Sequence, residues 1–215
     1  MIKTQASNEL TFYFQVKTQY TDKILHLLRD YDAAKSENRL LSISFTSLAD
    51  YMWYLRLICE RISHFGSRVL LYLAAAVSDF YIPASEMPEH KMQSSEGAPK
   101  LQLQLVPKML RPLVKFWVPK AYTISFKLET DPELLETKAK KALENYNHQL
   151  VIANLLHDRK RRVKFVGRSN TPDEAAYYTK LVELSDNEFE TGVEIEEKII
   201  GLLYNMHKNF CETSQ

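Results

Sequence analysis

Hydrophobic positions along the chain recur at two spacings, which together predict helices alternating with strands. Residues 21–34 carry apolar side chains at helical spacing, and residues 48–62 repeat that pattern behind Thr46 and Ser47, either of which can cap a helix. Short apolar runs that are typical of strands occur at residues 40–45, 69–73, 122–126 and 150–153.

The rest of the chain continues this alternation. In residues 101–105, leucines alternate with glutamines, which predicts a half-buried strand, and Pro107 then opens a short helix through Trp117. Asp131 is placed to cap a helix that ends near His148. Later strands are predicted at 163–166 and 178–184, with a polar loop at 169–173 between them, and Thr191 and Glu194 are spaced as a capping box for a last helix.

Strands separated by helices favour an α/β fold, in which a mainly parallel sheet lies between two layers of helices in a three-layer, Rossmann-like arrangement. A chain of 215 residues can bury one substantial core. We therefore predict one domain over 1–215. Leu10, Phe12, Phe14 and Val16 alternate with other residues within 7–16, which is also compatible with a strand there.

Composition narrows the class of protein. The net charge of +1 argues against a general nucleic-acid binder or a membrane-surface protein, because both usually need a basic excess. Two cysteines, Cys59 and Cys211, offer neither a disulfide framework nor a CxxC metal pair, so a cytoplasmic chain with reduced thiols is expected. The sequence has no apolar run of about 18 residues that would span a bilayer.

Candidate chemistry follows the strand predicted at residues 69–73. Three alanines, Ala74, Ala75 and Ala76, come directly after it, and Asp79 lies three residues further on. Open parallel sheets bind ligands beyond the carboxyl ends of their strands, where small side chains let a ligand approach and a carboxylate can accept hydrogen bonds. The structural alternative is that the alanines make room for a helix and Asp79 caps a turn.

The segment from Ala74 to Ser95, AAAVSDFYIPASEMPEHKMQSS, resembles the eukaryotic phosphopantothenoylcysteine synthetases, the ligases of coenzyme A synthesis. Further blocks that resemble this family follow in order: LVPKML at 105–110, SFKLETD at 125–131, KALENYNHQLVIANLL at 141–156 and GVEIEEKI at 192–199. The resemblance covers the chain from about residue 40 to its end, and residues 1–39 diverge.

The resemblance implies a ligase that joins 4'-phosphopantothenate to cysteine. The substrate carboxylate attacks the α-phosphate of a nucleoside triphosphate, which gives an acyl-nucleotide and releases pyrophosphate, and the amine of cysteine then displaces the nucleotide. ATP is the expected nucleotide, with CTP as the alternative, and Mg²⁺ would bridge its phosphates. The family also implies a homodimer.

Seven residues match positions that matter in this family. The resemblance implies that Lys91 meets the triphosphate and that the Asn154 amide bonds substrate. By the same resemblance, nucleotide and substrate binding falls to Ala75, Ala76, Asp79, Pro107 and Phe126. Ordinary interpretations stay open: Lys91 as a solvated lysine, Phe126 as a core ring and Asn154 as a turn residue.

The chain also departs from the family pattern. A Gly-rich phosphate loop of the type TSGGT and a DNFSSG-like segment are expected near the start, and neither occurs among these 215 residues. The sequence thus resembles a synthetase without its N-terminal quarter to third. In a doubly wound sheet that region supplies a central strand. Residues 1–39 or another chain would have to cover the gap, or the sequence is incomplete. A catalytically inactive homologue that dimerises with or regulates a complete synthetase is the alternative function.

Overall fold

The computed structural model describes residues 2–5, 10–13, 15–87, 89–90, 97, 100–169 and 176–214. Contacts between residues divide the chain into two compact units, Met1–Phe45 and Thr46–Gln215. The prediction of one domain over 1–215 therefore stays a prediction, and each unit is described by itself.

The first unit contains a hairpin and a helix. Strands β1 (Ile2–Gln5) and β2 (Leu10–Tyr13) pair with each other as an antiparallel two-stranded sheet. A short 3-10 turn, η1 (Thr18–Tyr20), leads into α1 (Thr21–Ser36), the helix predicted from the apolar spacing. Residues 40–45 form no regular element, so the strand predicted there is wrong.

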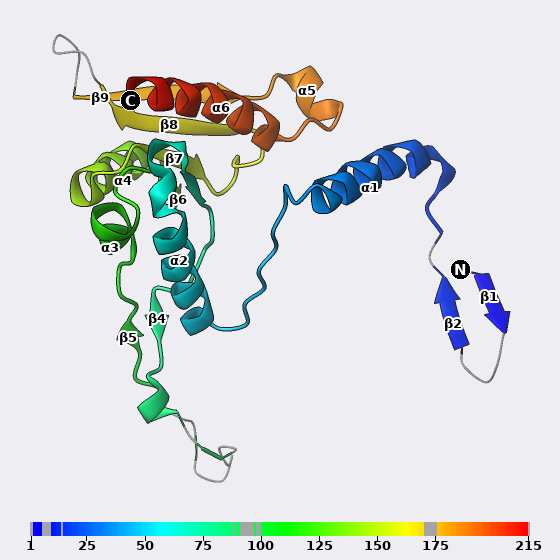
Figure 1. Ribbon diagram of the computed structural model, residues 1–215, viewed down its shortest axis with the longest axis horizontal. Helices are drawn as coiled ribbons and strands as arrows, with labels where there is room; N and C mark the ends of the chain where they lie inside the picture. The colour runs from blue at the N-terminus through cyan, green and yellow to red at the C-terminus, as the bar shows by residue number, and fades with distance from the viewer. Residues whose placement is uncertain are drawn as a thin grey trace. The chain divides into compact units, whose positions relative to one another are not determined.

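The second unit alternates helices and strands (Figure 1). Its first half contains α2 (Leu48–Ile62), η2 (Ser63–Arg68), β3 (Leu70–Leu73), β4 (Phe80–Tyr81), η3 (Ala84–Glu86), β5 (Gln104–Leu105), α3 (Leu110–Pro112) and the π-helical turn η5 (Leu113–Trp117). Its second half contains β6 (Tyr122–Glu129), α4 (Pro132–Tyr146), β7 (Leu150–Leu155), β8 (Arg162–Arg168), β9 (Tyr177–Glu183), α5 (Asp186–Glu190) and α6 (Ile195–Thr213).

A five-stranded sheet in the order β3-β6-β7-β8-β9 forms the centre of this unit. Strands β3, β6 and β7 are parallel, with Leu73 beside Ser125 and Leu128 beside Asn154. Strand β8 runs antiparallel to both β7 and β9. The predicted mainly parallel α/β sheet is thus confirmed, and the one reversed strand reflects the short turn between β7 and β8, which leaves no room for a crossover helix.

Helices cover both faces of the sheet, as the three-layer prediction requires. Residues of α6 pack against Ile124, Ile152 and Phe165 on one face. On the other face, α4 packs against Val151 and Val166, while α2 and η5 pack against β3. Alternate residues of each strand therefore belong to different cores.

Local signals explain where several helices begin and end. Ser47 caps α2 in a capping box with Asp50, and Asp131 caps α4, so both predicted caps are confirmed. Asn147 ends α4 with a left-handed φ of 56°. The capping box predicted from Thr191 and Glu194 is wrong: the Thr191 hydroxyl donates to carbonyls at the end of α5, and α6 has no side-chain cap.

An extended arm leaves the sheet between β3 and α3. Its strands β4 and β5 pair only over Phe80–Leu105 and Tyr81–Gln104, so most of the strand predicted at 101–105 is irregular. Among the described residues, no helix has both the length and the apolar character needed to cross a membrane.

Candidate functional site

The segment after β3 follows the carboxyl end of that strand without entering a helix. Ala75, Ala76 and Asp79 are all exposed in it, and the chain stays irregular until β4. The alternative in which the alanines pack against a helix is therefore wrong, because nothing covers them within the described part of the unit. Their small side chains leave the strand end accessible.

The returning strand of the arm brings Pro107, another predicted site residue, and its neighbour Lys108 close to Asp79. The Val106 amide donates to the Asp79 carbonyl at 2.9 Å, and the Lys108 ammonium donates to the Asp79 carboxylate at 2.6 Å. Asp79, Pro107 and Lys108 line one cavity of about 200 Å³. Its other walls are Tyr51, Met52, Leu55, Leu73, Val77, Ser78, Val106, Met109, Leu110, Leu113 and Tyr146.

Positive charges outnumber negative ones in this cluster, because the Asp79 carboxylate has two lysines, Lys108 and Lys127, around it. The hydrogen bond and charge of Lys108 hold the pKa of Asp79 below its usual value, and the charge of Lys127 lowers it further. The same hydrogen bond raises the pKa of Lys108. Both partners are exposed, so the pair contributes little to stability. Two lysines around one carboxylate can instead attract an anionic group.

Phe126 and Asn154 lie on the α6 face of the sheet, away from this cavity. The Phe126 ring packs edge to face against Tyr72, with centroids 4.9 Å apart, and contacts the core under α6. This packing shows the structural role of Phe126, and its stacking on a base stays a prediction. Asn154 pairs in register with Leu128 near the carboxyl end of β6.

The Asn154 side chain retains an unused acceptor. Its Oδ1 is buried and has no hydrogen-bond partner among the described residues. A buried amide oxygen normally finds a partner, so a ligand or water donor at this strand end would satisfy it. Asn154 forms part of β7, so it is not a turn residue.

The remaining catalytic candidate, Lys91, lies outside the described residues, in the connection between β4 and β5. Lys138 donates to the Glu129 carboxylate at 2.7 Å at the end of β6. Across the described residues, no group of three or more His, Cys, Asp or Glu side chains could hold a metal ion.

Sequence reasoning missed two features of this region. It did not identify Lys127, although a period of two places that lysine on the face opposite Phe126. It also did not predict that Lys108 would bond Asp79, because the two residues are 29 positions apart and meet only through the β4–β5 ladder.

The fold and this site define an α/β domain with polar groups gathered at the carboxyl ends of parallel strands. Residues 58–173 match the model of one family, the DNA/pantothenate metabolism flavoprotein C-terminal domain, and the chain belongs to this family.

Two curated relatives show how far the similarity extends. The chain is 49% identical to human phosphopantothenate–cysteine ligase over 183 residues, which are 85% of this chain and 56% of that protein. It is 39% identical to the Saccharomyces cerevisiae phosphopantothenate–cysteine ligase CAB2 over 176 residues, 73% of this chain and 48% of the relative. The chain thus spans about half the length of these relatives.

Solved structures agree with this assignment. A Cab2 mutant in complex with phosphopantothenate-cysteine matches with a TM-score of 0.80 and 37% identity, over 93% of this chain and 63% of that one. The DNA/pantothenate metabolism flavoprotein from Streptococcus pneumoniae matches at 21% identity with a TM-score of 0.51, which supports the fold alone.

Proposed function

We propose that this chain functions in phosphopantothenate–cysteine ligation, joining 4'-phosphopantothenate to cysteine through an acyl-nucleotide intermediate. The observation that carries this proposal is the cluster of Asp79, Lys108 and Lys127 at the end of β3, in a chain 49% identical to a human ligase of that name. The cluster has the charge and position that an anionic substrate requires.

The proposed reaction asks these residues to align groups and to neutralise charge. A nucleotide or phosphopantothenate phosphate would replace Asp79 as the partner of Lys108, which frees the carboxylate to accept from a substrate hydroxyl or amine. Lys91 would add positive charge where the triphosphate reacts. Positioning and preorganised charge can supply most of the rate enhancement in such a transfer.

ATP is the proposed nucleotide, with CTP as the alternative, and Mg²⁺ would enter with it. Mg²⁺ commonly binds one or two carboxylates together with substrate phosphates, so it does not require a protein cage. Ala75 and Ala76 leave the approach open, Pro107 helps to shape the cavity, and the unpartnered Asn154 oxygen would accept from substrate.

The test measures pyrophosphate release by the purified 215-residue chain with 4'-phosphopantothenate, Mg²⁺, and ATP or CTP. Release that depends on phosphopantothenate, and product formation on adding cysteine, are expected. Asp79→Asn removes the carboxylate that accepts from a substrate hydroxyl or amine, and Lys91→Ala removes positive charge at the reacting phosphates, so each should reduce pyrophosphate release by about tenfold or more. Lys160→Ala, on a turn distant in sequence from the site, is the matched control.

No release from a folded chain would contradict the proposal and favour the inactive homologue. Adding the chain to complete human phosphopantothenate–cysteine ligase would then test the alternative directly. If this chain is a dimerisation or regulatory partner, it should change the rate of the human enzyme or co-sediment with it.

We further propose a cytoplasmic homodimer. The described thiols are free, with Cys59 buried and Cys211 half-buried. The β4–β5 arm exposes Phe80, Leu101, Leu103 and Leu105, with Leu105 at 69% exposure. Such apolar surface favours association.

Sedimentation velocity would test this arrangement. Leu105→Glu should dissociate the dimer, whereas Leu41→Glu, at an exposed leucine outside the arm, should not. A Leu105→Glu chain that still sediments as a dimer would rule out the arm as the interface.

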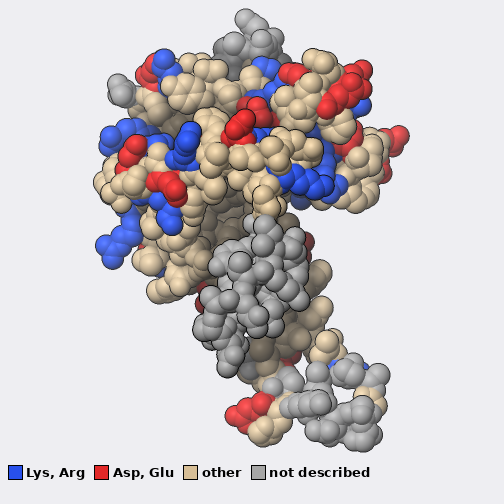
Figure 2. Space-filling view, turned by 90° about the vertical axis from the view of Figure 1, so that its right-hand side faces the viewer, with Lys and Arg blue, Asp and Glu red and all other residues tan. Residues whose placement is uncertain are grey.

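We propose no nucleic-acid partner, because the net charge of the chain is only +1. On the one face that Figure 2 shows, Lys and Arg side chains are interspersed with Asp and Glu side chains.

A further inference from the structure

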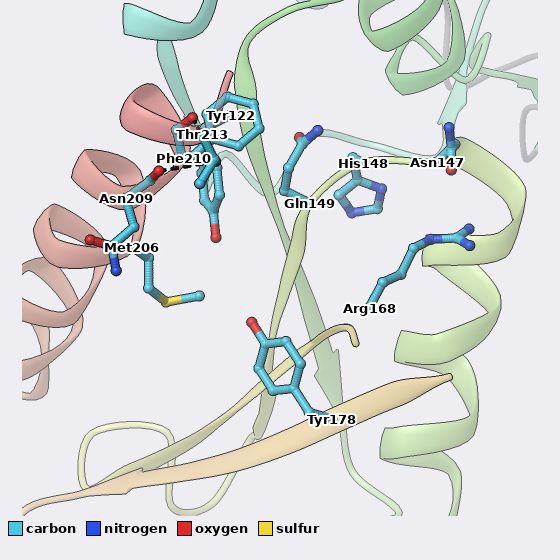
Figure 3. Close-up of a pocket in the computed structure, with 10 residues that line it drawn as sticks. All are labelled: Tyr122, Asn147, His148, Gln149, Arg168, Tyr178, Met206, Asn209, Phe210 and Thr213. Atoms are coloured by element: carbon cyan, nitrogen blue, oxygen red, sulfur yellow. Dashed lines mark hydrogen bonds between the residues drawn. The ribbon is translucent and has the colours of Figure 1, made fainter. Parts of the chain in front are cut away.

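A second cavity lies at the opposite ends of the strands, where β6, β7 and β9 begin and β8 ends. Its volume is about 530 Å³, within the range of small-molecule sites. The last two turns of α6 form one wall and the segment between α4 and β7 forms another (Figure 3). It shares no lining residue with the cavity that contains Asp79.

One wall contains a buried polar group without a partner. His148 is 1% exposed, and its Nε2 lies 2.8 Å from the Ser125 hydroxyl. Its Nδ1 is buried and has no partner among the described residues. Whichever ring nitrogen carries the proton, Nδ1 is left as an unused donor or acceptor, and buried groups of this kind normally find a partner.

Aromatic rings form the other walls. Tyr122 and Phe210 meet edge to face with centroids 5.1 Å apart. Tyr178 lies over Gly167, where a Cβ would come within 2.5 Å of its ring. In Figure 3 the hydroxyls of Tyr122 and Tyr178 point toward one another across the cavity. The walls thus offer flat apolar faces together with hydroxyl groups.

Charge at the cavity favours an uncharged occupant. Arg168 is the one charged residue among the described residues that line it, and its guanidinium donates to the Leu143 carbonyl at 2.9 Å, at the end of α4. The carboxyl ends of α4 and α6 both face the cavity through Asn147 and Thr213, and helix carboxyl ends repel anions.

We propose that this cavity is a second binding site, for a small, uncharged, planar aromatic ligand whose edge carries hydrogen-bonding groups. Its ring lies among Tyr122, Tyr178 and Phe210, and its polar edge bonds the tyrosine hydroxyls and the free nitrogen of His148. The site is separate from the proposed ligase chemistry and does not depend on it.

Benzamide and benzoate form a matched pair of probes, since they share shape and differ in charge. Saturation-transfer NMR and calorimetric titration of the full chain should show millimolar binding of benzamide and weaker binding of benzoate. Met206→Trp, which fills the cavity from α6, should abolish binding. Tyr178→Phe should weaken it about three- to tenfold, as expected for one lost hydrogen bond.

Two controls make the result decisive. Tyr177→Phe removes a hydroxyl from the neighbouring residue, which packs on the α4 side of the sheet, and should leave benzamide affinity unchanged. Asp79→Asn should also leave it unchanged, because that residue lines the other cavity. Absence of benzamide binding, binding that survives Met206→Trp in a folded chain, or benzoate binding as tight as benzamide binding would each overturn the proposal.

Discussion

Acid should destabilise this protein through His148. Burial, together with the positive charge of Arg168, lowers the pKa of this imidazole from 6.5 to about 4. The unfolded chain therefore binds a proton at this residue as the pH falls through 6.5, whereas the folded chain does so only near 4. The contribution of His148 to the free energy of unfolding is therefore fully present above pH 6.5 and is lost as the pH falls toward 4.

The size of the effect follows from the shift. A depression of about 2.5 pKa units corresponds to about 3 kcal/mol of unfolding free energy, at 1.36 kcal/mol per unit. A net stability of about 5–15 kcal/mol makes this a large fraction of the total.

The assay is urea unfolding followed by circular dichroism at several pH values between 7 and 4. His148→Gln keeps a hydrogen-bonding group near Ser125 and removes the titration. The wild-type chain should lose about 3 kcal/mol more than this variant across the interval, because the other titrating groups are common to both. His157→Gln is the matched control, at an exposed histidine, and should follow the wild type. Equal pH dependence in wild type and His148→Gln would refute the reasoning.

Three further substitutions test packing and capping, each by urea unfolding at neutral pH. Gly167→Ala should cost about 1–3 kcal/mol because its Cβ would meet the Tyr178 ring at 2.5 Å, and Tyr178→Leu in that background should recover part of the loss. Gly201→Ala should stabilise α6 by about 0.8–1 kcal/mol, since a Cβ there meets nothing within 4 Å; a loss of stability would contradict this. Ser47→Ala should cost about 1 kcal/mol by removing the α2 cap, and no change would show that the capping box is unimportant.

The elements that the sequence predicts well are those fixed by local pattern. Strand β6 alternates apolar and polar residues, β7 begins with the apolar run LVIA, and Asp131 followed by Pro132 marks the start of α4. The stretch 40–45 has the same alternating character, yet it forms no strand, because a strand also needs a neighbour to pair with. Pattern alone does not supply that neighbour.

The sequence identified residues of the candidate site, but it did not predict how they are arranged in space. A family resemblance identifies Asp79 and Pro107, whereas their common cavity depends on the β4–β5 ladder. Phe126 and Asn154 were expected beside them, but the alternation of strand residues places both on the α6 face. The sequence marks His148 only as the approximate end of a helix, and the fold shows that it is buried beside a cavity.

The two titrating regions give acid inactivation a specific interpretation. Lys108 holds the pKa of Asp79 below its usual value of 3.8, so this carboxylate stays charged throughout the interval from pH 6.5 to 4. Over the same interval His148 progressively favours the unfolded chain. A fall in the proposed ligase activity there would therefore arise from unfolding and not from protonation of Asp79. His148→Gln separates the two causes, because it should retain activity to lower pH than the wild type if unfolding is the cause, and should lose activity at the same pH if a site carboxylate is responsible.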